Sequence, residues 1–213
     1  ATCGIGLGAG DFTCNFAEGG WQRADWIMVK SPRWEHVGDW IQRKNCIENT
    51  TPEGVTAEEM LGKRAAETYT SMVYRQKASG NVDVTATMLF RHRMAPLIVL
   101  APTLGKSKTG HVEYREHWEI VLFDKGVNVW HHEFSDGKPS WKKAAFSTFP
   151  LAPNEEHTVR VQIRRTKRGP LITVKVGDHE FGYIDDALPE SLYLGITGCE
   201  GVNQFHDFSV EEP

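Results

Sequence analysis

The stretch HVEYREHWEIVLFDKGVNVWHHEF, residues 111–134, contains two strand-like runs separated by the turn sequence Asp124-Lys125-Gly126. In each run, aromatic and aliphatic side chains alternate with polar ones, which is typical of a strand with one buried and one hydrated face. The pattern therefore predicts an antiparallel hairpin. Its polar side carries more histidine and glutamate than a hydrated strand face requires, and we expect function there.

The register of this hairpin follows from the length of its turn. If all three turn residues lie outside the ladder, Glu119 faces His131 and His117 faces Glu133, close enough in each pair to hydrogen-bond. A slip by one residue would exchange the two faces of one strand. The core face predicted by this register consists of Trp118, Ile120, Leu122, Trp130 and Phe134.

The rest of the chain also favours strands. Residues 82–93 and 158–165 alternate between apolar and polar side chains, and residues 192–197 and 205–210 form short apolar runs near the end. Many short strands separated by turn residues indicate a β-sandwich or barrel. The length of 213 residues suits one all-β domain spanning residues 1–213. Residues 1–20 are predicted to be a glycine-rich loop or edge segment.

One short helix is predicted in a long excursion between strands, over residues 56–68. Thr56-Ala57-Glu58-Glu59 has the spacing of a capping box, and Met60 and Leu61 follow in helical spacing.

Composition and charge narrow the class of partner. The formal net charge is −4 and the sequence contains no basic block, so we expect neither nucleic acid nor an anionic membrane surface as a partner. No apolar run approaches the roughly 18 residues that a membrane span requires. The chain has four cysteines, Cys3, Cys14, Cys46 and Cys199, and none of them forms the CxxC pair typical of a zinc site. Two interpretations stay open. The cysteines can form two disulfides, one of them joining Cys3 and Cys14, or they can be buried free thiols.

The C-terminal sequence carries a family resemblance. The segment EHTVRVQIRRTKRGPLITVKVGDHEFGYIDD, residues 156–186, alternates strands and turns, and LYLGITGCEGVNQFHDFSV, residues 192–210, ends in an aromatic closing strand. These segments resemble concanavalin A-like lectin/glucanase domains, including laminin G-like modules and bacterial 3-keto-glycoside-hydrolase-type sandwich domains. The resemblance implies an all-β, two-sheet antiparallel jelly-roll sandwich with a ligand on the concave face of one curved sheet. It also implies a carbohydrate-active protein that is secreted, periplasmic or at the cell surface.

The sequence departs from the catalytic motifs of that superfamily. Laminarinase-type glycosidases carry closely spaced acidic residues along one strand, whereas Glu113, Glu116 and Glu119 are spaced by three and alternate between faces. The strand signatures of alginate lyases are also missing. The resemblance therefore assigns no catalytic residue.

The residues themselves suggest a catalytic cluster. His117, Glu119, His131 and Glu133 can take or give protons near neutral pH, because a carboxylate fixes the tautomer and charge of a neighbouring imidazole. Two alternatives stay open. The four side chains can form ordinary cross-strand salt bridges on a hydrated face, or they can bind a divalent metal. The main expectation is no cofactor, with a metal in this cluster or a structural calcium as the alternative.

Five further residues are candidates for substrate binding. Arg91 and Arg93 are predicted on the polar face of their strand, where a guanidinium could bind a sugar carboxylate or sulfate. Trp34 and Trp141 offer aromatic faces that stack on sugars. Tyr114 precedes the cluster, and its hydroxyl is a further candidate for proton transfer.

These observations support two hypotheses about function. The first is an enzyme that cleaves glycosidic bonds of a polysaccharide or oligosaccharide, by hydrolysis through a glutamate or by β-elimination through a histidine; the number of histidines slightly favours elimination. The second is a lectin-like binding module without catalysis. An interaction domain that uses the sandwich face for protein contacts is a third possibility.

Overall fold

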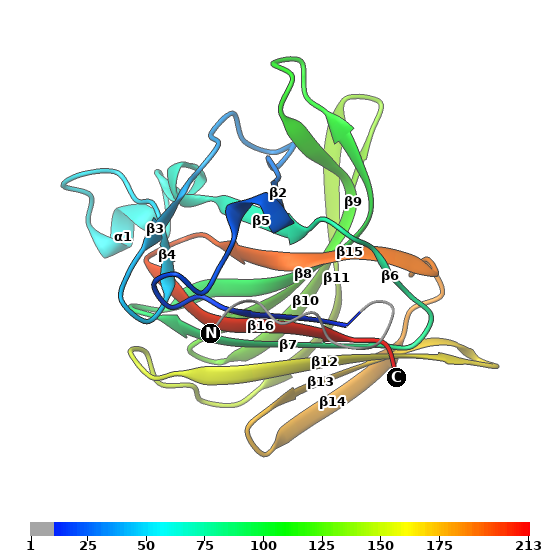
Figure 1. Ribbon diagram of the computed structural model, residues 1–213. Helices are drawn as coiled ribbons and strands as arrows, with labels where there is room; N and C mark the ends of the chain where they lie inside the picture. Colours follow the sequence, from blue (N-terminus) through cyan, green and yellow to red (C-terminus); the bar gives the residue numbers. More distant parts are fainter. Residues whose placement is uncertain (1–10) are drawn as a thin grey trace.

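The structure is a computed structural model that describes residues 11–213. It consists of two antiparallel sheets of eight strands each. The first sheet has the order β14-β13-β12-β7-β16-β4-β3, with β1 paired to β16. Figure 1 shows its longer strands, β7, β12, β13, β14 and β16, crossing the lower half of the molecule. The strands are β1 (Phe12–Asn15), β3 (Trp40–Gln42), β4 (Ile47–Asn49), β7 (Val82–Phe90), β12 (His157–Thr166), β13 (Gly169–Val176), β14 (His179–Ile184) and β16 (Asn203–Glu211).

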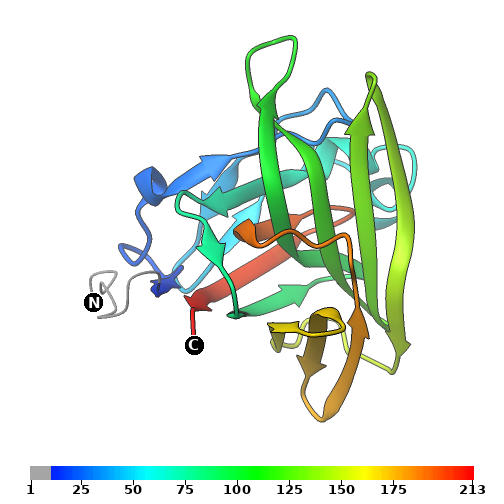
Figure 2. The ribbon, with the colours of Figure 1, turned by 90° about the vertical axis from the view of Figure 1, so that its right-hand side faces the viewer.

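The second sheet has the order β11-β10-β9-β8-β15-β5-β2, with β6 paired to β15. Figure 2 shows its longest strands side by side in green and yellow-green, bending along their length. The strands are β2 (Trp26–Met28), β5 (Thr70–Tyr74), β6 (Ala78–Ser79), β8 (Met94–Lys106), β9 (Val112–Phe123), β10 (Gly126–Ser135), β11 (Lys138–Thr148) and β15 (Ser191–Gly198).

The core lies between the two sheets because the alternating apolar residues of both point inward. Val84, Val161 and Phe205 from the first sheet and Leu100 and Ile120 from the second are fully or almost fully buried in one cluster. The predicted all-β sandwich is confirmed, as is the alternation over residues 82–90 and 158–165 that led to it.

A second apolar cluster covers the opposite side of the second sheet, which we call the outer face. It contains Val73, Leu97, Val99, Tyr114 and Val121. The segment after β2 lies over this face, where the buried Lys30 Nζ is 3.2 Å from Glu113 Oε1. This sheet is thus apolar on both sides in its centre, so its outer face can hold an enclosed site.

The helical segment is shorter than the sequence suggests. Helix α1 (Ala57–Met60) begins at the predicted capping box, in which the Glu59 N–H donates to the Thr56 hydroxyl, and a 3₁₀ turn, η2 (Ala65–Thr68), follows. Another 3₁₀ turn, η1 (Arg23–Asp25), precedes β2. Of the predicted N-terminal edge segment, residues 1–10 lie outside the described residues and β1 pairs along β16.

The predicted hairpin forms, but its register differs by one residue. Gly126 belongs to the ladder and pairs with Phe123, so only two residues make the turn. The shift exchanges the faces of β10, as a one-residue slip must. Trp130 and Phe134 therefore leave the predicted core face, and Trp130 packs against the cluster on the outer face. Trp118, Ile120 and Leu122 are core residues as predicted.

Two cysteines, Cys46 and Cys199, have free thiols. Cys3 lies outside the described residues, so its pairing with Cys14 stays a prediction. Within residues 11–213, no helix has both the length and the apolar character needed to cross a lipid bilayer.

Phe205 and Phe146 provide a matched test of this packing. Phe205 is fully buried and meets Trp40 edge-on with ring centroids 5.5 Å apart, whereas Phe146 is 63% exposed. We expect Phe205→Ala to lower the free energy of unfolding by about 3–5 kcal/mol, and Phe146→Ala by less than about 0.5 kcal/mol. Urea denaturation measures both, and equal losses would contradict this assignment of the core.

Candidate functional site

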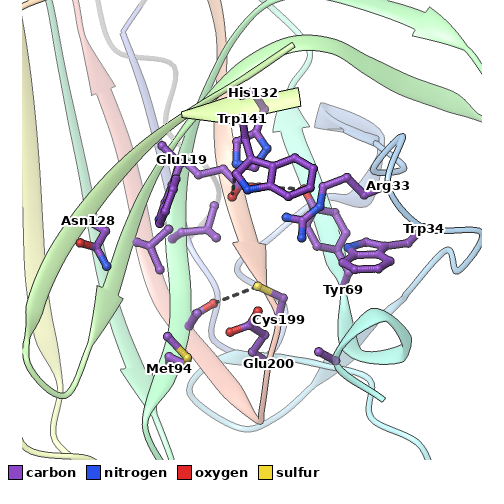
Figure 3. A pocket seen from close by; sticks show the side chains of 15 residues that line it. Arg33, Trp34, Tyr69, Met94, Glu119, Asn128, His132, Trp141, Cys199 and Glu200 are labelled. Carbon is purple, nitrogen blue, oxygen red and sulfur yellow. Dashed lines mark hydrogen bonds and ion pairs between the residues drawn. The ribbon is translucent and has the colours of Figure 1, made fainter. Parts of the chain in front are cut away.

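The outer face of the second sheet holds a pocket of about 240 Å³. Its floor comes from β8, β9 and β10, and its walls come from the segment after β2, the turn before β5, strand β11 and the loop after β15. The lining residues are Arg33, Trp34, Ala65, Tyr69, Met94, Ala95, Leu97, Glu119, Val121, Asn128, Trp130, His132, Trp141, Cys199 and Glu200. Ten of them are labelled in Figure 3.

One wall is an aromatic and cationic stack. The guanidinium carbon of Arg33 lies 4.6 Å from the ring centroid of Trp34 and 4.5 Å from that of Trp141. Figure 3 shows these three side chains gathered on one side of the pocket. The segment that carries Arg33 is fixed to the sheet, because the Lys30 N–H donates to the Val112 carbonyl and the Arg33 N–H donates to the Ser31 hydroxyl.

A buried carboxylate, Glu119, lies at the centre of the polar side chains. Its Oε1 is 3.2 Å from His117 Nε2 and 3.4 Å from the donating hydroxyl of Tyr69. Its Oε2 is 3.1 Å from His132 Nε2, a contact without hydrogen-bond alignment. The ladder produces this group, since His132 on β10 pairs directly with His117 on β9.

The imidazoles keep Glu119 ionised. Burial alone would raise the pKa of this carboxyl, but His132 and His117 outweigh burial and hold the pKa well below its usual range. Burial lowers the pKa of His117 despite the opposing effect of Glu119, so His117 is neutral at pH 7 and can donate its Nε2 proton to the carboxylate.

A second carboxyl group, Glu200, enters the pocket from the loop after β15. Figure 3 shows Glu119 and Glu200 approaching the pocket from opposite sides. Burial, and then the negative charge of Glu119, raise the pKa of Glu200. The backbone φ of Glu200 is 53°, a value that residues other than glycine rarely adopt. The Glu200 N–H donates to the Thr68 hydroxyl at 2.7 Å.

Three of the predicted site residues line the pocket, and a fourth, His117, lies beneath it. His117 and Glu119 form the buried pair described above, and Trp34 and Trp141 line the wall. Tyr114 lies behind them: it is fully buried, stacks on His117 with ring centroids 4.3 Å apart, and shares a 2.7 Å hydrogen bond with Ser71. It supports the cluster from below and does not line the pocket.

His131 and Glu133 do not join this group, contrary to the predicted register. They lie on the side of β10 that faces the first sheet, because the shorter turn reverses that strand's faces. His131 stacks on Trp118 with ring centroids 4.0 Å apart, and its Nε2 is 2.9 Å from Glu116 Oε1. The predicted pairs of Glu119 with His131 and His117 with Glu133 are therefore wrong, and His132 takes the position expected for His131.

Arg91 and Arg93 also lie outside the pocket. Strand β7 ends at Phe90, so both arginines belong to the turn before β8 and do not continue the alternation of a strand. Arg91 forms an ion pair with Glu48 of the first sheet, and Arg93 forms one with Asp124 at the hairpin turn. Arg91 and Arg93 would border the polar face of the hairpin only if their strand lay in the same sheet, and β7 belongs to the other sheet.

Several lining residues were not predicted to belong to the site: Arg33, Tyr69, Asn128, Trp130, His132 and Glu200. His132 and Trp130 depended on one register choice. Arg33 is adjacent to the predicted Trp34, and an arginine beside an aromatic is a weak signal for a stacked cation. Glu200 precedes Gly201 at the end of a strand, and this position gives no sign that the side chain points into a pocket.

Two groups of side chains have ligand atoms within 4.8 Å of one another: His117, Glu119 and His132, and on the opposite side Glu116, His131 and Glu133. In the first group the two imidazole rings are stacked, 4.7 Å apart and within 12° of parallel. A lone pair lies in the plane of its ring, so parallel stacked rings cannot both direct one at a single ion about 2.1 Å away. The first group fits a carboxylate held between two imidazoles better than a metal ion.

No family model matches this chain, and no curated protein matches it in sequence. Solved structures do match. The carbohydrate binding module CBM66 from Bacillus subtilis has a TM-score of 0.59 at 11% identity, covering 88% of this chain and 96% of its own. The cellulose induced protein Cip1 has a TM-score of 0.57 at 13% identity, and the match covers 95% of this chain and 97% of Cip1. Lectin II from Ulex europaeus has a TM-score of 0.56 at 8% identity, and the match covers 94% of this chain and 97% of the lectin. The chain thus has the concanavalin A-like jelly-roll fold, as its sequence resemblance implied.

The protonation of His117 affects the free energy of unfolding. Because its folded-state pKa is lowered, the neutral form stabilises the fold fully above its usual pKa of 6.5, and this contribution is lost as the pH falls through the folded-state value. We expect the gap in unfolding free energy between wild type and His117→Gln to be largest above pH 6.5 and to narrow at lower pH. Chemical denaturation across pH measures it, with the exposed His111→Gln as control. A gap that stays constant would contradict the assignment.

Metal content is a second test of the cluster. From the ring geometry we expect the purified protein, dialysed against zinc and then against buffer, to retain well under one equivalent in mass spectrometry. We also expect its thermal unfolding to be unchanged by a chelator. One tightly held equivalent that disappears in His132→Gln would show that a ring rotates to bind the ion, and would contradict this interpretation.

Proposed function

We propose that this protein is an extracytoplasmic carbohydrate-active enzyme that hydrolyses glycosidic bonds in the outer-face pocket. The observation that carries the proposal is a pair of carboxyl groups with opposite pKa shifts facing one space: Glu119, whose pKa two imidazoles hold well below its usual range, and Glu200, whose pKa is raised by burial and by Glu119. Two carboxyl groups whose environments separate their pKa values are the arrangement that glycoside hydrolysis uses.

The chemistry follows from these protonation states. Glu200 donates its proton to the glycosidic oxygen as the bond from that oxygen to the anomeric carbon breaks. The negative charge of Glu119 stabilises the positive charge that develops on the sugar ring. Glu119 then accepts a proton from the attacking water, whose oxygen forms the new bond to the anomeric carbon. His117 and His132 contact Glu119 and hold its carboxylate in position.

Aromatic side chains around the pocket suit a sugar. Trp34, Trp130 and Trp141 line it, and Trp141 is 51% exposed although it is a large apolar residue. Indole faces stack on the apolar faces of sugar rings. Two proteins with the same fold, CBM66 and the lectin UEA-II complexed with galactose, carry carbohydrate binding in their names, which supports a sugar ligand here.

Hydrolysis is favoured over the elimination that the number of histidines suggested. Elimination through His131 with Arg91 or Arg93 has lost its geometric support, because none of the three lines the pocket. His117 is 2% exposed and lies beneath Glu119, away from the lining. Among the groups that line the pocket, the carboxyl pair has the opposite pKa shifts that suit an acid–base couple.

A non-catalytic sugar-binding module is the second candidate. The stacked wall formed by Arg33, Trp34 and Trp141 would bind a sugar without any reaction, and the carbohydrate binding module with this fold favours that role. In such a module Glu119 and Glu200 would only accept hydrogen bonds from hydroxyl groups.

Turnover by acid variants separates the two candidates. We expect Glu200→Gln to lower kcat by about 10²–10⁴-fold, because the amide cannot supply a proton. In the wild type, activity should fall as the pH rises through the raised pKa of Glu200, because the carboxyl then loses its proton. The assay incubates the protein with a panel of neutral and acidic polysaccharides and follows both new reducing ends and the absorbance of unsaturated uronates.

Glu133→Gln is the matched control, since Glu133 is an exposed glutamate on the opposite side of the same sheet. It should retain activity. Full turnover by Glu200→Gln would overturn the hydrolytic mechanism, and unsaturated products would replace it with elimination. Sugar binding without any product from the whole panel would establish the binding module instead.

A further inference from the structure

Two cations on the outer face rest on aromatic rings and have no anionic partner. Arg33 lies between Trp34 and Trp141, and the Lys143 ammonium lies 5.3 Å from the ring centroid of Trp130 and 5.1 Å from that of Phe146. Within residues 11–213, neither cation has a carboxylate at ion-pair distance. Most arginines near the sheets differ in this respect, as Arg91 and Arg160 show by their pairs with Glu48 and Asp83.

The stacking of Arg33 leaves a defined binding edge. Its guanidinium carbon lies over both the Trp34 and the Trp141 ring, and no described acceptor takes a hydrogen bond from its N–H groups. A planar fork of this kind pairs with a carboxylate or sulfate through two parallel hydrogen bonds, which are about twice as strong as bonds to neutral acceptors. Since the indoles hold the guanidinium in place, little side-chain freedom is lost on binding.

The nearby carboxyl groups do not neutralise Arg33. Glu119 already contacts His117 and His132, and Glu200 lies in surroundings that favour its protonated form. Both lie close enough to Arg33 to share the pocket, yet neither forms an ion pair with it. A positive charge is therefore available to a ligand inside a partly desolvated space, where its attraction to an anion is stronger than in water.

Lys143 extends this positive character along β11. It is two residues beyond Trp141 on the same strand, so it lies about 7 Å farther along the same face. Trp141 pairs with His132, and Lys143 pairs with Trp130. Beyond Lys143, the 63% exposed Phe146 continues the aromatic surface over β10 and β11. The face outside the pocket thus repeats the pocket's combination of an aromatic ring and an unpaired cation.

We propose that the ligand is a polysaccharide with acid groups on successive sugars, that Arg33 binds the acid group of the sugar in the pocket, and that Lys143 binds that of a neighbouring sugar over Trp130 and Phe146. The acid group can be a carboxylate, as in a uronate, or a sulfate ester. The inference takes the sugar ligand from the proposed function and adds charge and polymer length. The net charge of −4 would by itself repel a polyanion, so the two local cations must supply the attraction.

Binding to charged and neutral forms of the same polymers tests this proposal. The probes are polygalacturonate, alginate and dextran sulfate, compared with carboxyl-reduced polygalacturonate, carboxyl-reduced alginate and dextran. We expect the full chain to bind at least one anionic polymer about tenfold or more tighter than its neutral counterpart at low salt, and the preference to shrink at high salt. The uronates and dextran sulfate distinguish the two sources of the acid group.

Substitutions connect the preference to these two residues. Arg33→Gln should lose about tenfold or more of the affinity for the anionic polymer, and Lys143→Gln about threefold, with little change for the neutral one. Arg168→Gln, at an exposed turn, and Lys142→Gln, next to Lys143 but directed to the other side of the strand, remove the same charge and should bind as wild type. Arg33→Lys should keep part of the preference, and thermal unfolding checks that each variant is folded.

The proposal is overturned if no anionic polymer is preferred, or if Arg33→Gln loses no more affinity than Arg168→Gln. The assay does not require turnover. Glu200→Gln should keep the charge preference while losing cleavage. A protein that prefers anionic polymers but cleaves none would refute the hydrolytic function and leave this inference standing, whereas cleavage without charge preference would do the reverse.

Discussion

The close approach of β10 and β11 at Gly126 is the constraint on which the site depends. Gly126 has a φ of 126°, and a Cβ there would lie 2.1 Å from the Ser147 carbonyl oxygen. Only glycine can start the strand at this point, and its pairing with Phe123 shortens the turn to two residues. That register places His132 and Trp130 on the outer face beside Glu119. A longer turn would move both toward the core.

This constraint explains how far the sequence alone could predict the structure. Alternation along residues 82–90 and 158–165 reports burial directly, so the sandwich and its core were predictable. Register is different, because both faces of β10 contain a histidine and large apolar residues, Val127 and Val129 on one face and Trp130 and Phe134 on the other, so either face could be buried. His131 and His132 therefore could not be assigned to faces from the pattern, and the loop residues Arg33 and Glu200 reach the pocket only through tertiary packing.

Burial of polar side chains beneath the pocket has a cost that the fold offsets locally. Tyr114, Ser71 and Thr197 form a hydrogen-bonded chain under the floor, with Tyr114 stacked on His117. Each buried hydroxyl has a partner, which avoids the penalty for an unsatisfied polar group. The chain holds His117 in one orientation, and His117 in turn holds Glu119. The position of the Glu119 carboxylate thus rests on packing within the second sheet and not on a flexible loop.

The two proposals meet in the electrostatics of Glu200. Burial, and then the negative charge of Glu119, raise the pKa of this carboxyl, and the positive charge of Arg33 opposes that effect. When Arg33 pairs with an acid group of the ligand, its opposing effect weakens and a further negative charge enters the pocket. Both changes raise the pKa of Glu200, so an anionic sugar strengthens the protonated state that the reaction needs. With a neutral sugar, the charge of Arg33 continues to lower the pKa of Glu200. Arg33 thereby couples recognition of a charged ligand to the protonation of Glu200.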